Sequence, residues 1–115
     1  MLKIKNRLKN KSDFEKVYKK GNFFSGKKIG LKVLKNNKKL VRIGFVVGKN
    51  FSKKAVERNK AKRVLRSASV ELIDNIVPGL DIIIILNKTS KLKDLNKKDI
   101  SVEIKSMLTK SNIIK

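Results

Sequence analysis

The apolar residues between Lys53 and Asn75 recur every three or four positions. At 3.6 residues per turn, this spacing places them on one stripe of a helix. The stripe consists of Ala61, Val64, Leu65, Ala68 and Leu72. An apolar stripe of this width needs a core to pack on, so the pattern predicts a half-buried helix from about Lys54 to about Asn75. The only proline, Pro78, and the following Gly79 mark the break after this helix.

Two stretches before this helix alternate between apolar and polar or small residues, which is typical of half-buried strands. The apolar face of residues 28–34 holds Ile29, Leu31 and Val33, and that of residues 41–48 holds Val41, Ile43, Phe45 and Val47. Residues 35–39 indicate an exposed turn, so the two stretches are predicted to form an antiparallel hairpin. Three glycines leave room on one face of the sheet: Gly30, Gly44 and Gly48. The favoured occupant is another element of the same protein, and the alternative is a ligand strand.

The run from Ile82 to Leu86 is continuously apolar and β-branched, except for its final leucine. Such a run predicts a strand, residues 81–87, that is buried on both faces. Continuous burial implies a central position in the sheet. A parallel neighbour would be reached through the preceding helix.

Further helices are predicted near both ends of the chain. Ser12 and Glu15 have capping-box spacing, and Gly21 is placed to end this first helix in a left-handed conformation. A last helix begins at Asn96, with Asp99 in its first turn. Its apolar stripe is Ile100, Ile104 and Leu108. Residues 1–11 form a basic arm, either disordered or packing one leucine on the core, and residues 111–115 are expected to fray.

These elements follow the order helix, two or three strands, helix, strand, helix. The predicted fold is an α+β two-layer sandwich. A chain of 115 residues suits one domain, and no repeat or second domain is visible, so residues 1–115 are predicted to form a single domain. The pattern of charges described next predicts that this domain binds RNA.

The polar side of the predicted middle helix carries one sign of charge. Arg58, Lys62 and Arg66 recur every four residues, with Asn59 and Arg63 beside them. Neighbouring like charges at this spacing repel each other by a few tenths of a kcal/mol per pair. A solvated basic face is the ordinary interpretation of a charge run. Because this run is one-signed, recurs at helical spacing and begins at a helix N-terminus, we favour a helix that faces RNA.

Composition narrows the possible partners and chemistry. The formal net charge is +22, which favours a polyanion as partner, with nucleic acid the first candidate and an anionic membrane surface the alternative. The absence of cysteine and histidine excludes zinc fingers, disulfide frameworks and histidine-based acid–base catalysis. The longest apolar run is too short to span a bilayer and no signal peptide is visible, so a soluble intracellular protein is expected.

The acidic residues do not form a recognisable metal-binding pattern. Nine Asp and Glu are scattered along the chain, without a DxD, ExK or HExxH arrangement. No GxxxxGK[ST] loop is present either. Catalysis by this chain alone is therefore not expected, no catalytic residue is assigned, and the sequence identifies no metal ligands.

The residues of the basic helix also carry a family resemblance. Ala55-Val56, followed by Arg58–Arg63 and Arg66, resembles the "RNR" helix of the bacterial ribonuclease P protein subunit. One departure is Lys60, which stands at the third position of the triplet in place of arginine and keeps the charge but not the two-pronged guanidinium. The similarity covers nearly the whole chain in family order. It implies the same fold with a left-handed βαβ crossover, whereas the general rule for crossovers predicts the right-handed form.

The resemblance implies partners and roles. The catalytic RNA subunit would carry the active site and remove the 5′ leader of precursor tRNA, with Mg²⁺ required mainly by the RNA. The residues expected to bind the RNA subunit are Lys53, Lys54, Arg58, Asn59, Lys60, Lys62, Arg63 and Arg66. The expected leader-binding cleft holds Phe14, Tyr18, Lys28 and Lys32.

Three alternatives accompany these expectations. Spacing alone makes Phe14 and Tyr18 core residues, because they lie four positions apart on one helix face. A ribosomal or general RNA-binding protein without a processing role is the alternative function, and an autonomous endonuclease is a third. The family implies a cytoplasmic location, without membrane or DNA partners. Oligomeric state is left open.

Overall fold

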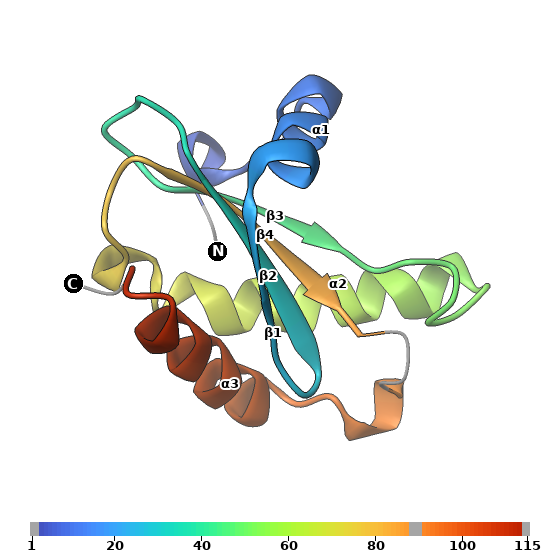
Figure 1. The fold of residues 1–115 in the computed structure, drawn as a ribbon. Helices are drawn as coiled ribbons and strands as arrows, with labels where there is room; N and C mark the ends of the chain where they lie inside the picture. Colours follow the sequence, from blue (N-terminus) through green and yellow to red (C-terminus); the bar gives the residue numbers. More distant parts are fainter. Residues whose placement is uncertain (1–2, 88–90, 114–115) are drawn as a thin grey trace.

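The computed structural model describes residues 3–87 and 91–113 (Figure 1). The elements in chain order are η1 (Ile4–Asn6), α1 (Lys11–Lys20), β1 (Asn22–Ser25), β2 (Ile29–Lys35), β3 (Arg42–Val46), α2 (Ala55–Val70), η2 (Ile73–Asn75), β4 (Leu80–Leu86), η3 (Leu92–Asp94) and α3 (Lys97–Lys110). The predicted α+β order of helix, strands, helix, strand, helix is confirmed. β1 is the optional third strand of the first group.

The four strands form one mixed sheet in the order β1-β2-β4-β3. β4 pairs antiparallel with β2 and parallel with β3, which confirms its predicted central position. The predicted hairpin between residues 28–34 and 41–48 is wrong, because β4 lies between these two strands. The connection from β2 to β3 instead passes around the start of β4. There the Gly79 carbonyl accepts from the Asn36 amide, and the Gly79 amide donates to the Leu40 carbonyl. The left-handed crossover from β3 through α2 to β4 stays an expectation from the resemblance.

The main core lies between one face of the sheet and the pair α2 and α3. Ala61, Leu65 and Ala68 of α2 are fully buried, as the apolar stripe predicted. The α3 residues predicted to face the core are also buried: Ile100, Ile104 and Leu108. Figure 1 shows α2 and α3 along one side of the sheet and α1 on the other.

α1 covers only part of the opposite sheet face, where it packs on β2 and β4. A smaller core lies there, made of Leu8, Val17 and Ile83. Leu8 belongs to the N-terminal arm, and its amide donates to the Ile43 carbonyl at 3.0 Å. Arg7 forms a bridge with Ile43 on the same edge strand. The alternative in which the arm packs one leucine on the core is therefore confirmed, and Met1 and Leu2 lie outside the described residues.

A part-buried ion pair fastens α1 to this face of the sheet. The Arg42 guanidinium donates to both Asp81 oxygens, at 2.8 and 2.6 Å, and to Asp13 of α1 at 3.2 Å. Asn36 donates to Asp81 at 2.8 Å. The hydrogen-bonded Asp81 carboxylate raises the pKa of Arg42 above its ordinary value. This network fixes α1, and with it the aromatic residues that α1 carries.

The helix ends differ from the predictions at three points. The Ser12 cap is wrong, because α1 begins at Lys11 and the Phe14 amide donates to the backbone carbonyl of Asn10. Gly21 ends α1 as predicted, but its backbone is extended, with φ −73°, rather than left-handed. Glycine is needed there because a Cβ would lie 2.5 Å from the Val17 carbonyl oxygen. α2 ends at Val70 rather than near Asn75, because tighter 3₁₀ turns follow it.

Hydrogen bonds are made at both ends of α3. The Asn96 cap of α3 is confirmed, since its side-chain oxygen accepts from the Asp99 amide at 2.8 Å. After α3, the Ile113 amide donates to Leu108 and its carbonyl accepts from Val77. The fraying expected for residues 111–115 stays a prediction, and residues 114–115 lie outside the described residues.

Candidate nucleic-acid interface

The basic side chains of α2 lie on the surface, as the sequence pattern predicted. Asn59, Lys60 and Arg63 are exposed, and Arg58, Lys62 and Arg66 are half-buried. No ion pair to any of these five cations is found among the described residues. The helix therefore presents uncompensated positive charge along its outer side while its apolar stripe packs on the sheet.

The loop before α2 is fixed against the first turn of the helix. The Ser52 hydroxyl donates to the Glu57 carboxylate at 2.6 Å, and the Ser52 carbonyl accepts from Arg58 at 2.8 Å. Lys53 and Lys54 follow directly and are exposed. Both predicted lysines therefore lie beside the basic side of α2, whereas Glu57 is turned toward the loop.

A cavity of about 220 Å³ continues this basic surface past the edge strand β3. Its lining is Arg7, Leu8, Lys9, Phe14, Ile43, Gly44, Phe45, Lys62 and Arg66. Four of these residues are cationic, and no carboxylate belongs to the lining. The Arg66 guanidinium lies 5.9 Å from the centroid of the Phe45 ring. A site with these cations and two aromatic rings is suited to a phosphate group and its attached base.

Sequence reasoning missed Arg7 and Lys9 as part of this surface. The Arg7 Nε atom is buried and has no hydrogen-bond partner among the described residues. The signal was present in the arm itself, since Leu8 lies between two cations and is the leucine that packs on the core. Once Leu8 is buried, its two neighbours are held close to β3.

Phe14 lies in this cavity and also covers a glycine of β3. A Cβ built on Gly44 would lie 2.4 Å from the Phe14 Cζ atom. The prediction that another element of the same protein fills the space above the sheet glycines is thus confirmed at Gly44. Phe14 is only half-buried, so its ring is both a packing residue and a part of the surface.

Tyr18 and Lys32 meet where α1 leaves the sheet face open. The Lys32 Nζ atom lies 4.9 Å from the centroid of the Tyr18 ring and donates to the Tyr18 carbonyl at 2.6 Å. The Tyr18 side chain remains 38% exposed. Its partial burial raises the pKa of the phenol above its ordinary value, so the ring is neutral at pH 7. These two predicted cleft residues therefore form one cation–aromatic pair on the surface.

Lys28 does not join this pair. Its amide donates to the Glu103 carboxylate, and its ammonium lies 3.9 Å from Asp99. Both acidic residues belong to α3, on the other side of the sheet. The structure therefore does not bring Lys28 together with Tyr18 and Lys32, because the turn before β2 is bonded to α3.

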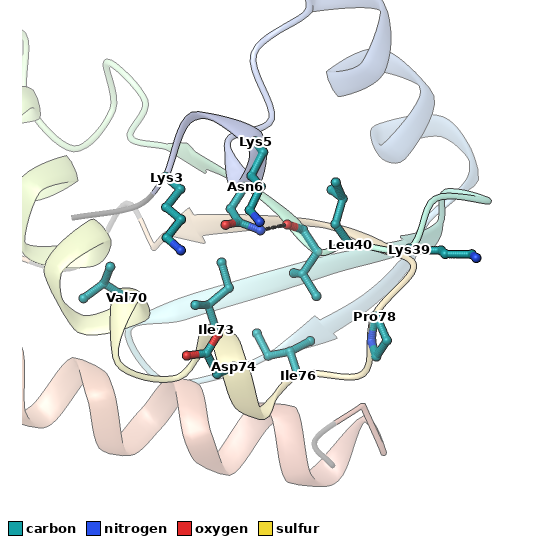
Figure 2. Close-up of a pocket in the computed structure, with 11 residues that line it drawn as sticks. Lys3, Lys5, Asn6, Lys39, Leu40, Val70, Ile73, Asp74, Ile76 and Pro78 are labelled. Atoms are coloured by element: carbon teal, nitrogen blue, oxygen red, sulfur yellow. Dashed lines mark hydrogen bonds between the residues drawn. The ribbon is translucent and has the colours of Figure 1, made fainter.

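A larger cavity of about 570 Å³ lies elsewhere, between the arm, the loop before β3 and the segment after α2 (Figure 2). Lys3, Lys5 and Lys39 line it together with Asp74. The Asn6 amide donates to the Val41 carbonyl at 2.8 Å, which holds the arm against the start of β3, and the dashed line at Asn6 in Figure 2 marks this hydrogen bond. The cavity contains no aromatic ring and none of the predicted binding residues.

Two features of the described residues bear on the class of protein. No group of three Asp, Glu, His or Cys that could hold a metal ion is found there, and Asp13 and Asp81 both bind Arg42. Within residues 3–87 and 91–113, no helix is long and apolar enough to cross a membrane. The fold and the charged surface together define a small, strongly basic α+β domain suited to a polyanionic partner.

Comparison with known proteins identifies the family. The family model Ribonuclease P matches residues 2–112, and the chain belongs to this family. The ribonuclease P protein component of a Pseudanabaena species is 36% identical over 115 residues, covering 99% of this chain and 97% of that one. The component from Clostridioides difficile is 37% identical over 107 residues, covering 92% and 91%.

Solved structures agree with this assignment. The RNase P protein of Staphylococcus aureus superposes with a TM-score of 0.81 at 27% identity, covering 96% of this chain and 98% of that one. The RNase P protein of Thermotoga maritima gives 0.80 at 26% identity, covering 90% and 96%. The chain is therefore a component of an endoribonuclease that processes tRNA.

Proposed function

We propose that this chain is the protein subunit of a bacterial, cytoplasmic ribonuclease P, which binds the catalytic RNA subunit and the 5′ leader of precursor tRNA and assists removal of the leader. One observation supports this most strongly. The uncompensated charge of α2 continues around the edge of the sheet to Phe14, so a single surface offers both phosphate-binding and base-stacking groups.

The outer side of α2 is the proposed contact with the RNA subunit. The residues involved are Lys53, Lys54, Arg58, Asn59, Lys60, Lys62, Arg63 and Arg66. Their cations neutralise phosphates and lower the repulsion between two RNA molecules. If six to ten phosphates are neutralised, the affinity falls by roughly 10³ to 10⁵ between 50 and 200 mM salt.

The partly open sheet face is the proposed binding surface for the leader. The exposed ring of Tyr18 stacks on an unpaired base, and Lys32 neutralises a neighbouring phosphate. Phe14 adds a second ring where the face meets the basic cavity. A surface of this kind holds a single strand without reading its sequence, as leaders of different tRNAs require.

The cleavage step belongs to the RNA partner in this proposal. The described residues offer no histidine or clustered carboxylates for acid–base work or for a metal site, so magnesium would be held chiefly by RNA phosphates. The contribution of the protein is to bring substrate and RNA together and to offset their charge. This raises the affinity for precursor tRNA over mature tRNA.

Reconstitution tests the proposal directly. Precursor tRNA is incubated at low magnesium with the RNA subunit alone, the protein alone, and both together. We expect cleavage at the 5′ end of the mature tRNA only in the mixture. Cleavage by the protein alone would assign the activity to this chain, and no stimulation of the RNA subunit would favour a general RNA-binding role. Either result refutes the proposal.

A charge variant tests the role of α2. Arg58→Ala combined with Arg63→Ala removes two phosphate contacts, so the slope of log K against log salt for the RNA subunit should flatten by about two units. The matched control is Lys98→Ala with Lys105→Ala, two exposed lysines of α3, which changes the net charge equally. Equal effects of the two double variants would mean that only net charge matters and would contradict a localised contact.

A further inference from the structure

The sheet face carries a second cavity, of about 410 Å³, next to β1 and away from α1. Apolar side chains form much of its lining, among them Phe23, Phe51, Val46 and Ile85. Its polar groups are neutral, and no charged residue lines it. The volume is in the range of pockets that hold a small organic group such as a nucleobase.

Phe23 is the most exposed aromatic residue at this cavity. Its side chain is 57% exposed, although it belongs to a strand. The ring covers the backbone of Gly30 on β2, where an added Cβ would lie 2.9 Å from the Phe23 Cε1 atom. Glycine at position 30 therefore lets the ring lie close to the sheet, supported on one side and open to solvent on the other.

The neighbours of Phe23 connect this cavity to the Tyr18–Lys32 pair. Phe23 and Lys32 are direct cross-strand partners, so their Cβ atoms lie about 5 Å apart on one face of the sheet. Lys32 in turn contacts the Tyr18 ring. An aromatic ring, a cation and a second aromatic ring thus follow one another from α1 to β1. This is the arrangement by which proteins hold successive nucleotides of a single strand.

We propose that Phe23 stacks on a base of the single-stranded leader and that the cavity beside it receives this base, one step beyond the site at Tyr18 and Lys32. This inference rests on the proposed function, since it assumes that a single strand follows the sheet face. The cation beside the cavity, Lys32, and the net charge of +22 favour a polyanion as the occupant, whereas a second copy of this chain, with the same net charge, would be repelled.

The test compares variants of the reconstituted RNA–protein complex in binding to precursor tRNAs with leaders of increasing length, and to mature tRNA. The variants are Phe23→Ala, Phe23→Leu and Phe23→Trp. The control is Val102→Ala, which truncates a residue of α3 that is 64% exposed, on the other side of the sheet. Because Phe23 is largely exposed, its replacement leaves the core intact.

We expect Phe23→Ala to weaken binding of long-leader precursor about fivefold or more, with no effect on mature tRNA or on leaders too short to reach β1. Phe23→Leu should weaken binding similarly, because leucine lacks a π-face, and Phe23→Trp should match or exceed the parent protein. Val102→Ala should change nothing. A 2-aminopurine placed in the leader at the position where the length effect begins should fluoresce more strongly with Phe23→Ala than with the parent protein.

Three results would overturn the inference. One is equal binding of the parent protein and Phe23→Ala at every leader length. Another is binding of long-leader precursor by Phe23→Leu as tight as by the parent protein, which would show that an apolar contact suffices. The third is an equal loss with precursor and mature tRNA. Failure of the proposed function looks different, because the parent complex itself would then show no preference for a leader.

Discussion

The contact between Phe14 and Gly44 gives a quantitative test of how the helix α1 is seated on the sheet. A methyl group at Gly44 would lie 2.4 Å from the Phe14 Cζ atom and 2.8 Å from Cε1. These distances are about 1 Å shorter than ordinary carbon contacts, so the ring or α1 must move. Overpacking of this kind costs about 1–3 kcal/mol, so Gly44→Ala should lower the Tm by roughly 4–12 °C.

A double-mutant cycle isolates this contact. In the Phe14→Ala background the obstacle is gone, and Gly44→Ala should then be neutral or stabilise by up to about 1 kcal/mol, because alanine in a strand loses less backbone entropy than glycine. The control is Gly48→Ala, whose added Cβ meets only the Asn50 backbone nitrogen, at 3.9 Å. Its effect should stay within about 0.5 kcal/mol.

Urea unfolding of the four proteins of the cycle, together with Gly48→Ala, provides the free energies. We expect an interaction energy of about 1–3 kcal/mol between positions 14 and 44. If Gly44→Ala costs the same with and without the Phe14 ring, the penalty comes from the strand backbone, and the reasoning from this contact is refuted.

Three further predictions concern stability and titration. Asp81→Asn should cost about 3 kcal/mol in urea unfolding. This is the lower end for a broken buried ion pair, because Arg42 is only part-buried and keeps its 3.2 Å contact with Asp13; a loss below about 1 kcal/mol would contradict this. Asn96→Ala should cost about 1 kcal/mol through the lost cap of α3, and an unchanged Tm would show that the cap is replaced. Tyr18 should ionise above pH 10 when its absorbance near 295 nm is followed. Because folding raises the pKa of Tyr18, its contribution to stability is present below pH 10 and is lost as the pH rises through the pKa of the folded state. A titration midpoint below pH 10 would reverse the sign of this contribution.

Hydrophobic periodicity predicted the elements well because each pattern reflects local burial. The alternation of Ile29, Leu31 and Val33 identified a strand and its buried face, and all three are buried. The same alternation could not identify the neighbouring strand, because side-chain burial is nearly the same whichever strand lies alongside. The continuous run Ile82–Leu86 held the missing information, since a strand buried on both faces belongs between two others.

The candidate site was predictable to the extent that it lies on one element. The spacing from Arg58 to Arg66 placed a row of basic residues on α2, and the structure keeps them on the surface. Arg7 and Phe23 escaped prediction because their surroundings come from other parts of the chain. Arg7 reaches α2 only through the buried Leu8, and the Phe23 ring lies over Gly30 only because β1 pairs with β2.

The N-terminal arm combines protection of a sheet edge with the placement of charge. β3 is an edge strand, and unpaired edges invite pairing with other chains. The arm limits this exposure through the Arg7 bridge and the Leu8 hydrogen bond, both to Ile43. Those contacts also bring Arg7 and Lys9 to the cavity that Lys62 and Arg66 reach from α2. Four like charges at one cavity oppose the compact state, and a bound phosphate backbone would relieve this repulsion, so the energetic cost of the arm's position falls when RNA is bound.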